Sequence, residues 1–143
     1  MARVCLPVQR VAASVASFAD VATYALAMPH AVENTGSDGL RSWAIGRSTF
    51  VWERPLRKSD LAALGSAAPT GPILGVYVVD LEEKQALLSS KPRFCFTTPH
   101  FDGYRAVLVR LDKIGSRALQ ELITDAWLAR APKRAAAAYL AGN

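Results

Sequence analysis

The sequence predicts an α+β fold in which a mainly antiparallel sheet is covered by helices on one face. Segments of strand-like composition come in pairs joined by short turns, which favours antiparallel pairing. Segments with apolar residues at helical spacing lie between these pairs. The predicted order is helix, strand, strand, short helix, strand, helix, strand, strand, helix. This order is typical of a two-layer domain whose second sheet face is open to solvent or to a partner.

The predicted domain occupies residues 17–143, and residues 1–16 are predicted to form a loose extension because they show no clear periodicity. Ser17 is a good helix cap, and the apolar residues that follow it repeat at helical spacing. Pro29 ends this helix, because proline cannot continue one. The polar segment 31–39 is predicted to be a loop.

A hairpin follows at 41–45 and 48–53, with Gly46 and Arg47 in its turn. Glycine at the first turn position suits a type II′ turn, which matches the twist of paired strands. The predicted pairs are Ile45 with Ser48, Trp43 with Phe50, and Arg41 with Trp52. We expect this aromatic face to be buried, with the arginine lying over the second tryptophan at its rim.

The middle of the chain predicts a short helix, a strand and a longer helix. Residues 60–64 form the short helix, with Ser59 as its cap. Residues 73–79 have little polarity, as expected for a buried strand. Asp80 begins a capping pattern, and the helix that it opens ends before Pro92.

The last third predicts a second hairpin and the strongest helix of the chain. Aromatic residues at 94–96 lead into a turn that contains proline, histidine, aspartate and glycine, and a strand at 106–111 follows. In that strand Val107, Val109 and Leu111 are expected on one face, with Ala106, Leu108 and Arg110 on the other. The final helix has one apolar face, made by Leu119, Leu122, Ile123, Ala126 and Trp127.

The composition is typical of a folded protein, since 51% of the 143 residues are hydrophobic and 20% are charged. Cys5 and Cys95 are far apart in the sequence, so we expect no disulfide framework and a cytoplasmic location. No apolar run reaches the ~20 residues that a spanning helix needs, so we expect no membrane contact.

The net charge of +5 is unevenly distributed along the chain. Residues 84–117 hold seven basic side chains against two acidic ones. Such a basic half is compatible with binding a polyanion. The alternative is an arginine-rich surface that is simply solvated.

Four motifs occur in an informative order. They are Ala25-Leu26-Ala27-Met28-Pro29, then residues 42–51, then residues 96–104 with the strand 106–111, and finally residues 122–127 leading into Ala131-Pro132-Lys133-Arg134. In these motifs the chain resembles the MmcQ/YjbR family of small bacterial proteins, over about residues 17–141. The resemblance implies a two-layer fold similar in outline to the frataxin-like fold. It also implies DNA binding, through a proposed double-wing arrangement of strands.

The DNA-binding interpretation needs cations on one surface, because phosphate contacts supply most of the affinity. The candidate nucleic-acid-binding residues are Arg47, Arg54, Arg57, Lys58, Arg93 and Arg105. Against this interpretation, better-known members of the family carry a lysine in the turn where this chain has Phe101-Asp102-Gly103. The alternative is a basic surface whose arginines pair with nearby carboxylates.

The alternative function is a small-ligand or protein-interaction module that uses the open sheet face and the loop around His100. Its candidate ligand-binding residues are Trp43, His100, Asp102 and Tyr104, which are aromatic or polar-tipped and lie near loops. The composition favours a purely structural interpretation over this one, in which Asp102 and Gly103 form an ordinary turn and Trp43 belongs to the core.

The sequence predicts no catalytic role, no metal and no cofactor. It contains no P-loop, dinucleotide fingerprint or nucleophile elbow. His100 and Asp102 are two residues apart on a turn, where side chains rarely point at each other as a catalytic pair requires. The histidines, His30 and His100, do not have the spacing of a metal site.

Overall fold

The computed structural model describes residues 15–142, and every element named below lies within them. The helices are α2 (Phe18–Leu26), α3 (Lys58–Leu64), α4 (Leu81–Ser90), α5 (Ser116–Arg130) and α6 (Lys133–Gly142). The strands are β1 (Ala31–Thr35), β2 (Arg41–Ile45), β3 (Ser48–Glu53), β4 (Ile73–Tyr77), β5 (Cys95–Phe96) and β6 (Ala106–Arg110). Short 3-10 turns lie in the connections, and one of them is Pro99–Phe101.

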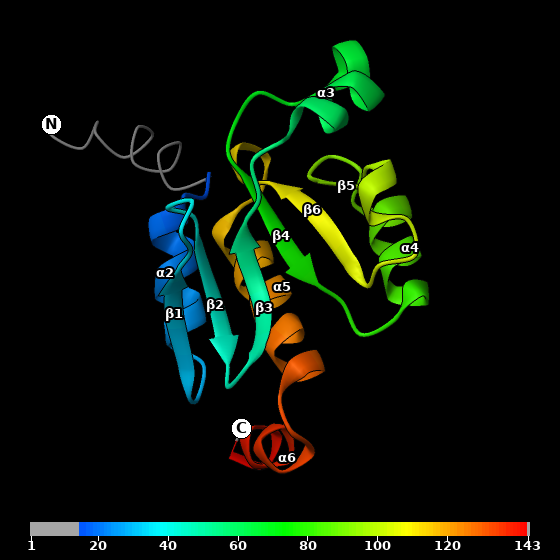
Figure 1. Ribbon diagram of the computed structural model, residues 1–143. Helices are drawn as coiled ribbons and strands as arrows, with labels where there is room; N and C mark the ends of the chain where they lie inside the picture. Colours follow the sequence, from blue (N-terminus) through cyan, green and yellow to red (C-terminus); the bar gives the residue numbers. More distant parts are fainter. Residues whose placement is uncertain (1–14, 143) are drawn as a thin grey trace, which may run out of the picture.

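Within the described residues, six strands form an antiparallel sheet in the order β1-β2-β3-β4-β6-β5. Helices cover one face of it, and α5 crosses behind the central strands in Figure 1. Val21 of α2 and Trp127 of α5 are buried in one core with Trp43 and Val76 of the sheet, and Leu87 of α4 packs against that core. The predicted α+β class, with helices on one face of a mainly antiparallel sheet, is confirmed.

The edge strand β1 was predicted to be a loop, and this prediction is wrong. Residues 31–35 pair with β2 along its whole length, from Ala31 opposite Ile45 to Thr35 opposite Arg41. Four of the five β1 residues are exposed, so the segment has the polar composition of a loop. An edge strand has one neighbour only, and exposed polar residues on it oppose unwanted pairing with other chains.

The register between β2 and β3 also differs from the prediction. The turn is as expected, since Ile45 pairs with Ser48 and Gly46 has a φ of 60°. A bulge then shifts the pairing by one residue, so that Trp43 pairs with Val51 and not with the preceding phenylalanine. The shift lets two consecutive β3 residues, at 50 and 51, both be buried in the helix-facing core. Trp52 therefore lies on the opposite sheet face, where it packs with a second apolar cluster.

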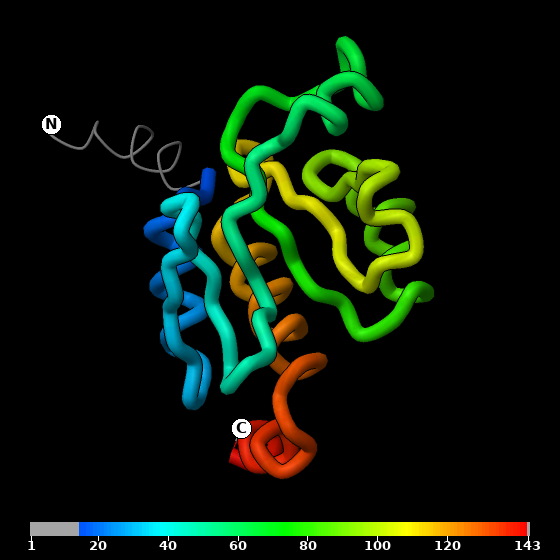
Figure 2. Tube along the Cα trace, viewed as in Figure 1, coloured from blue at the N-terminus to red at the C-terminus, as the bar shows by residue number. Residues whose placement is uncertain are grey.

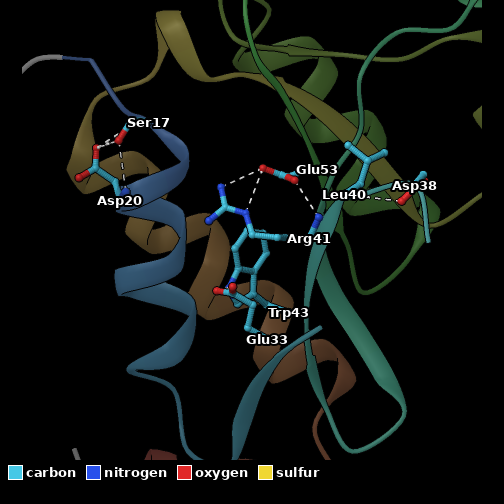
Figure 3. Close-up of polar contacts among 8 residues, drawn as sticks. All are labelled: Ser17, Asp20, Glu33, Asp38, Leu40, Arg41, Trp43 and Glu53. Atoms are coloured by element: carbon cyan, nitrogen blue, oxygen red, sulfur yellow. Dashed lines mark hydrogen bonds and ion pairs between the residues drawn. The ribbon is translucent and has the colours of Figure 1, made fainter. Parts of the chain in front are cut away.

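Because of this shift, Arg41 does not lie over Trp52. Its guanidinium group forms an ion pair with Glu53, with Nη2 at 2.9 Å from Oε2, and stacks on the rings of Phe18 and Trp43 (Figure 3). The indole N–H of Trp43 donates to Glu33 Oε1 at 2.9 Å, which connects the edge strand to the core (Figure 3).

Local helix signals account for most of the helix starts. Ser17 caps α2, because its hydroxyl accepts from the backbone N–H of Asp20 and the Asp20 carboxylate accepts from the N–H of Ser17 (Figure 3). Asp80 caps α4 in the same way by accepting from the N–H at position 83. Helix α3 begins two residues earlier than predicted, at Lys58 instead of Asp60, so Ser59 lies inside the helix.

The residue just before the predicted domain start at 17 already packs with the domain. Ala16 is buried, and its N–H donates to the Leu111 carbonyl at 3.3 Å. The rest of the predicted extension, residues 1–14, lies outside the described residues.

The second predicted hairpin is present as β5 and β6, with Cys95 opposite Val109 and Phe96 opposite Leu108. The alternation predicted for β6 is confirmed, because Val107 and Val109 face the helices while Ala106 and Leu108 face the other side. The connection between these strands, residues 97–105, is called the His100 loop below.

Candidate functional site

The His100 loop folds back over the sheet face that the helices leave uncovered. Phe101, at the end of its 3-10 turn, is buried against Ile73, Ala106 and Leu108, and Trp52 packs against the same cluster. The face that was predicted to be open is therefore covered in part by the chain itself. The part of this sheet face that remains accessible is the surface around the His100 loop.

Lys84 of α4 ties the loop to the helical layer. Its Nζ donates to the carbonyl oxygens of Phe101 at 2.6 Å and of Tyr104 at 2.9 Å, and the side chain is only 7% exposed. Burial lowers the pKa of Lys84, and the nearby Asp102 carboxylate opposes this effect in part. The ammonium group fixes the backbone of the loop at two points.

Arg54 holds the same loop from the other side. Its guanidinium group lies 5.1 Å from the centre of the Phe101 ring, donates to the Pro55 carbonyl at 2.6 Å and pairs with Asp60 Oδ2 at 3.0 Å. Burial acts to raise the pKa of Asp60, but the hydrogen bond from the Arg57 N–H, the Arg54 guanidinium and Thr98 outweigh it, so the pKa is lowered. The carboxylate stays ionised at neutral pH.

The buried polar side chains of the described residues are concentrated at this loop. They are Arg54, Asp60, Lys84 and Thr98. Burial of charged groups is costly unless they are paired, so a fold that gathers them at one loop fixes the conformation of that loop strongly. Irregular segments held this firmly are where binding residues are commonly positioned.

The exposed side of the loop carries a cluster of aromatic rings. The Phe101 ring lies 4.9 Å from the His100 ring and 5.9 Å from the Tyr104 ring, both in edge-to-face arrangement. Tyr104 is 57% exposed, and His100 and Asp102 are also exposed. Three of the four predicted ligand-binding residues thus lie together on this loop.

Trp43, the fourth predicted ligand-binding residue, does not belong to the site. It is fully buried on the helix-facing side of the sheet, and its N–H is already bound to Glu33. The aromatic side chain that takes its place on the open face is Trp52. The Trp52 indole lies across Gly75 of the neighbouring strand, where an added Cβ would be 2.3 Å from the ring.

The first of two hollows beside the loop is called the Tyr77 hollow, and its volume is about 310 Å³. It is lined by Thr49, Trp52, Tyr77, Phe101, Tyr104, Arg105, Ala106 and Arg130, so no described acidic residue lines it. The guanidinium groups of Arg105 and Arg130 lie 5.4 Å and 4.3 Å from the centre of the Tyr77 ring. Arg130 is held in place because its Nε donates to the Thr49 carbonyl at 3.1 Å.

The second hollow, called the Arg57 hollow, has a volume of about 320 Å³. Arg57 and His100 line it together with the acidic Asp38 and Glu53. The two hollows adjoin, since Trp52 and Phe101 line both. The Arg57 hollow is mixed in charge, and the Tyr77 hollow is cationic.

Arg54 was predicted to contact DNA, and the structure places it in the interior. It is 4% exposed and its guanidinium group is paired with Asp60, so little of it is available to a phosphate on the surface. The position follows the end of β3, where the chain turns toward α3, and the side chain fills the space beneath Phe101.

The other five predicted cations are exposed but are spread over the molecule. Arg47 is in the β2–β3 turn, at the opposite end of the sheet from α3, where Arg57 and Lys58 lie (Figure 1). Arg93 precedes the edge strand β5, and Arg105 is the last residue of the His100 loop. The wing tips therefore do not form one patch, and of these cations only Arg57 and Arg105 line a hollow beside the loop.

The ion pairs found among the described residues do not include the arginines of the Tyr77 hollow. These pairs are Arg41–Glu53, Arg54–Asp60 and Arg110–Asp112. Arg105 and Arg130 lie outside all of them, so their charge is available to an anion.

Sequence reasoning missed Trp52, Tyr77, Lys84 and Arg130 as site residues. Helical spacing held a signal for two of them. Lys84 is three residues before Leu87, and Arg130 is three residues after Trp127, so each is a cation placed on the apolar stripe of its helix. A cation in that position needs a hydrogen-bonding or charged partner, so its presence indicates a specific contact.

Burial raises the pKa of the Cys95 thiol to about 11, so this cysteine is a weak nucleophile at neutral pH. Among residues 15–142 there is no group of three or more His, Cys, Asp or Glu side chains arranged to hold a metal ion. None of the described helices has the length and apolar character to cross a membrane.

Comparison with known proteins identifies close relatives. No family model matches the chain. The uncharacterised proteins Rv2570 of Mycobacterium tuberculosis and Mb2600 of Mycobacterium bovis are each 50% identical to it over 131 residues, which cover 90% of this chain and 98% of the relative. The chain belongs to the family of these mycobacterial proteins.

A solved structure shares the fold. The Deinococcus radiodurans protein DR2400, which has a DUF419 domain, matches with a TM-score of 0.61 over 84% of this chain and 82% of that one. The two sequences are 17% identical, so the match concerns the arrangement of helices and strands and not the site.

Proposed function

We propose that this protein binds DNA, and that it does so with the uncovered sheet face beside the His100 loop. The observation that carries the proposal is the Tyr77 hollow, where Arg105 and Arg130 flank one ring and no described acid lines the wall. Guanidinium groups bind phosphate through paired hydrogen bonds and also stack on aromatic rings. The combination of cations with exposed aromatic rings is typical of nucleic-acid-binding surfaces.

The proposal moves the contact surface away from the hairpin tips that the family resemblance suggested. Arg47 lies at the far end of the sheet, and Arg54 is buried. Arg105 and Arg57 are kept as contacts because they line the two adjoining hollows. Membership of the MmcQ/YjbR type, a role without catalysis and a cytoplasmic location are inferred from the sequence and remain part of the same proposal.

A charge-reversal pair tests this function. Fluorescence anisotropy of a labelled DNA at low salt is measured for the unaltered protein and for Arg105→Glu. Because phosphate contacts dominate affinity, the variant should bind about tenfold more weakly. Arg117→Glu is the matched control, since Arg117 is an exposed arginine on α5, which covers the other sheet face.

Equal weakening by the two reversals would indicate a response to net charge alone and would remove the proposed surface. Binding that neither variant changes would do the same. Absence of any DNA binding at low salt would remove the function itself.

The second candidate function is a small-ligand site in the Arg57 hollow. It is favoured by the concave shape of this hollow and by the convergence of Arg57 and His100 on it. A ligand found by thermal-shift screening should lose its stabilising effect in His100→Ala, because bound ligand raises the melting temperature by mass action. Retention of the full shift by that variant would exclude this hollow.

A further inference from the structure

We infer that the Tyr77 hollow receives an unpaired nucleotide, so that the preferred substrate is single-stranded nucleic acid. The inference rests on the proposed function and adds which form of nucleic acid the surface selects. It follows from the way in which the exposed ring of Tyr104 and the cations Arg105 and Arg130 are held around this hollow.

The exposed ring of Tyr104 is a ready stacking platform. Its carbonyl is bound by Lys84 at 2.9 Å, and its ring packs edge-to-face on the buried Phe101 at 5.9 Å. More than half of the residue nevertheless remains exposed. A ring that is fixed on one side and free on the other loses little conformational entropy when a base stacks on it.

Arg105 and Arg130, which line the same hollow as Tyr104, suit the phosphate of the same nucleotide. Arg130 is oriented by the Thr49 carbonyl and by the Tyr77 ring, and Arg105 approaches that ring from the end of the His100 loop. Their spacing around Tyr77 is set before a ligand arrives. Preorganised guanidinium groups bind a phosphate without first paying to order a flexible side chain.

Charge decides which of the two hollows takes the phosphate. The Arg57 hollow has Asp38 and Glu53 in its wall, and these carboxylates offset part of the positive charge of its arginines. The Tyr77 hollow has no described acid in its wall. A neighbouring nucleotide in the strand can extend across the shared wall of Trp52 and Phe101 toward His100.

The shape of the site favours a single strand over a duplex. In a duplex the faces of the bases are stacked on one another, so they cannot contact Tyr104 without leaving the stack. A hollow of about 310 Å³ is at the lower limit of ligand pockets and suits one turned-out base with its phosphate. Base stacking on aromatic side chains is the usual source of affinity for single strands.

The experiment compares a labelled oligothymidylate with a labelled hairpin duplex that has the same number of phosphates. Each is titrated with the unaltered protein, with Tyr104→Ala and with Tyr104→Phe at one low salt concentration. Tyr104 is exposed, so neither change should unfold the protein. Circular dichroism and the melting temperature check this for each variant.

The inference predicts tighter binding of the single strand than of the duplex. Tyr104→Ala should weaken single-strand binding about 5- to 150-fold, the range expected for stacking of one base, and leave duplex binding nearly unchanged. Tyr104→Phe should restore most of the loss, because stacking needs the ring and not the hydroxyl.

Duplex binding that equals or exceeds single-strand binding, with no effect of Tyr104→Ala, would overturn the inference and leave the proposed function standing. An absence of binding to either nucleic acid would overturn both.

Discussion

Asp60 shows how one buried residue contributes to the loop that forms the site. Its carboxylate accepts hydrogen bonds from Arg54 and from the N–H of Arg57, and Arg54 in turn stacks on Phe101. The chain of contacts runs from the start of α3 to the core of the His100 loop. Removal of one charge would leave the other buried and unpaired, which costs far more than loss of a surface pair.

We therefore predict that Asp60→Asn lowers the free energy of unfolding at neutral pH by about 3 kcal/mol. Because the folded-state pKa of Asp60 is lowered from 3.8, its contribution is complete above that pH and is lost as the pH falls through the folded-state pKa. The stability difference between the unaltered protein and the variant should thus shrink in acid. Urea unfolding measured from neutral pH to acid tests both statements.

The matched control is Asp112→Asn. The Arg110–Asp112 pair spans 4.0 Å, and its side chains are 32% and 42% exposed. A pair of this kind contributes about 0–1 kcal/mol. A loss as large in the control as at Asp60 would contradict the distinction between the two pairs.

Lys84 gives a prediction with the opposite pH range. Burial lowers its pKa from the usual 10.5, so between the folded-state and unfolded-state values the unfolded chain binds more protons. The contribution of this residue to stability therefore rises with pH in that alkaline window. Lys84→Met should remove the rise, and at neutral pH it should cost about 1–3 kcal/mol, because the carbonyls of Phe101 and Tyr104 lose their donor.

The measurement is the difference in unfolding free energy between Lys84→Met and the unaltered protein, followed from neutral to alkaline pH. Taking the difference cancels groups that titrate in both proteins, such as Cys95. A difference that does not depend on pH would contradict the account of Lys84.

At the scale of elements, the pairing of β3 with its two neighbours, β2 and β4, places Trp52 on the open sheet face. The bulge at β2–β3 turns this residue away from the helices, and Gly75 opposite it leaves room for the indole. Both features are needed, because any side chain at position 75 would occupy the space of the ring. The wall between the two hollows thus depends on a glycine in the neighbouring strand.

Gly75→Ala should lower the free energy of unfolding by about 1–3 kcal/mol, since the added methyl group overlaps the Trp52 ring and forces it to shift. Gly142→Ala is the control, because nothing lies within 4 Å of the Cβ that it adds near the end of α6. Thermal unfolding of both variants measures the difference. A neutral effect at position 75 would mean that Trp52 moves freely and does not form a fixed wall.

Which elements the sequence could predict follows from how local their causes are. The cap at Ser17 and the alternation of β6 depend on neighbouring residues, and both were predicted. The bulge at Phe50 depends on the helices that pack over the sheet, and no local sequence pattern indicates it. Strand β1 is exposed along most of its length, so its composition is that of a loop.

The site was predicted in part for the same reason. His100, Asp102 and Tyr104 are neighbours in sequence, and they are neighbours on the loop. Arg130 reaches the hollow from the end of α5, so only the tertiary structure brings it to Tyr77. The charge pattern predicted a basic surface but could not separate the buried Arg54 from the exposed cations.

At the scale of the whole molecule, the two sheet faces have different roles. The helices α2 and α5 supply the main core on one face, α4 packs against it, and Figures 1 and 2 show α5 lying behind the central strands. The other face carries a smaller apolar cluster, a loop fixed by buried charges and two hollows. Stability is concentrated on the first face, which leaves the second available for binding.

The most direct test of the account is the salt dependence of single-stranded DNA binding. The logarithm of the affinity should fall linearly with the logarithm of salt concentration, and Arg105→Gln should reduce the slope by about 0.7, the value for one phosphate contact on a single strand. Arg117→Gln, on the helical layer, should leave the slope unchanged. Equal slopes for the unaltered protein and Arg105→Gln, or an equal reduction by Arg117→Gln, would contradict the claim that the face beside the His100 loop binds nucleic acid.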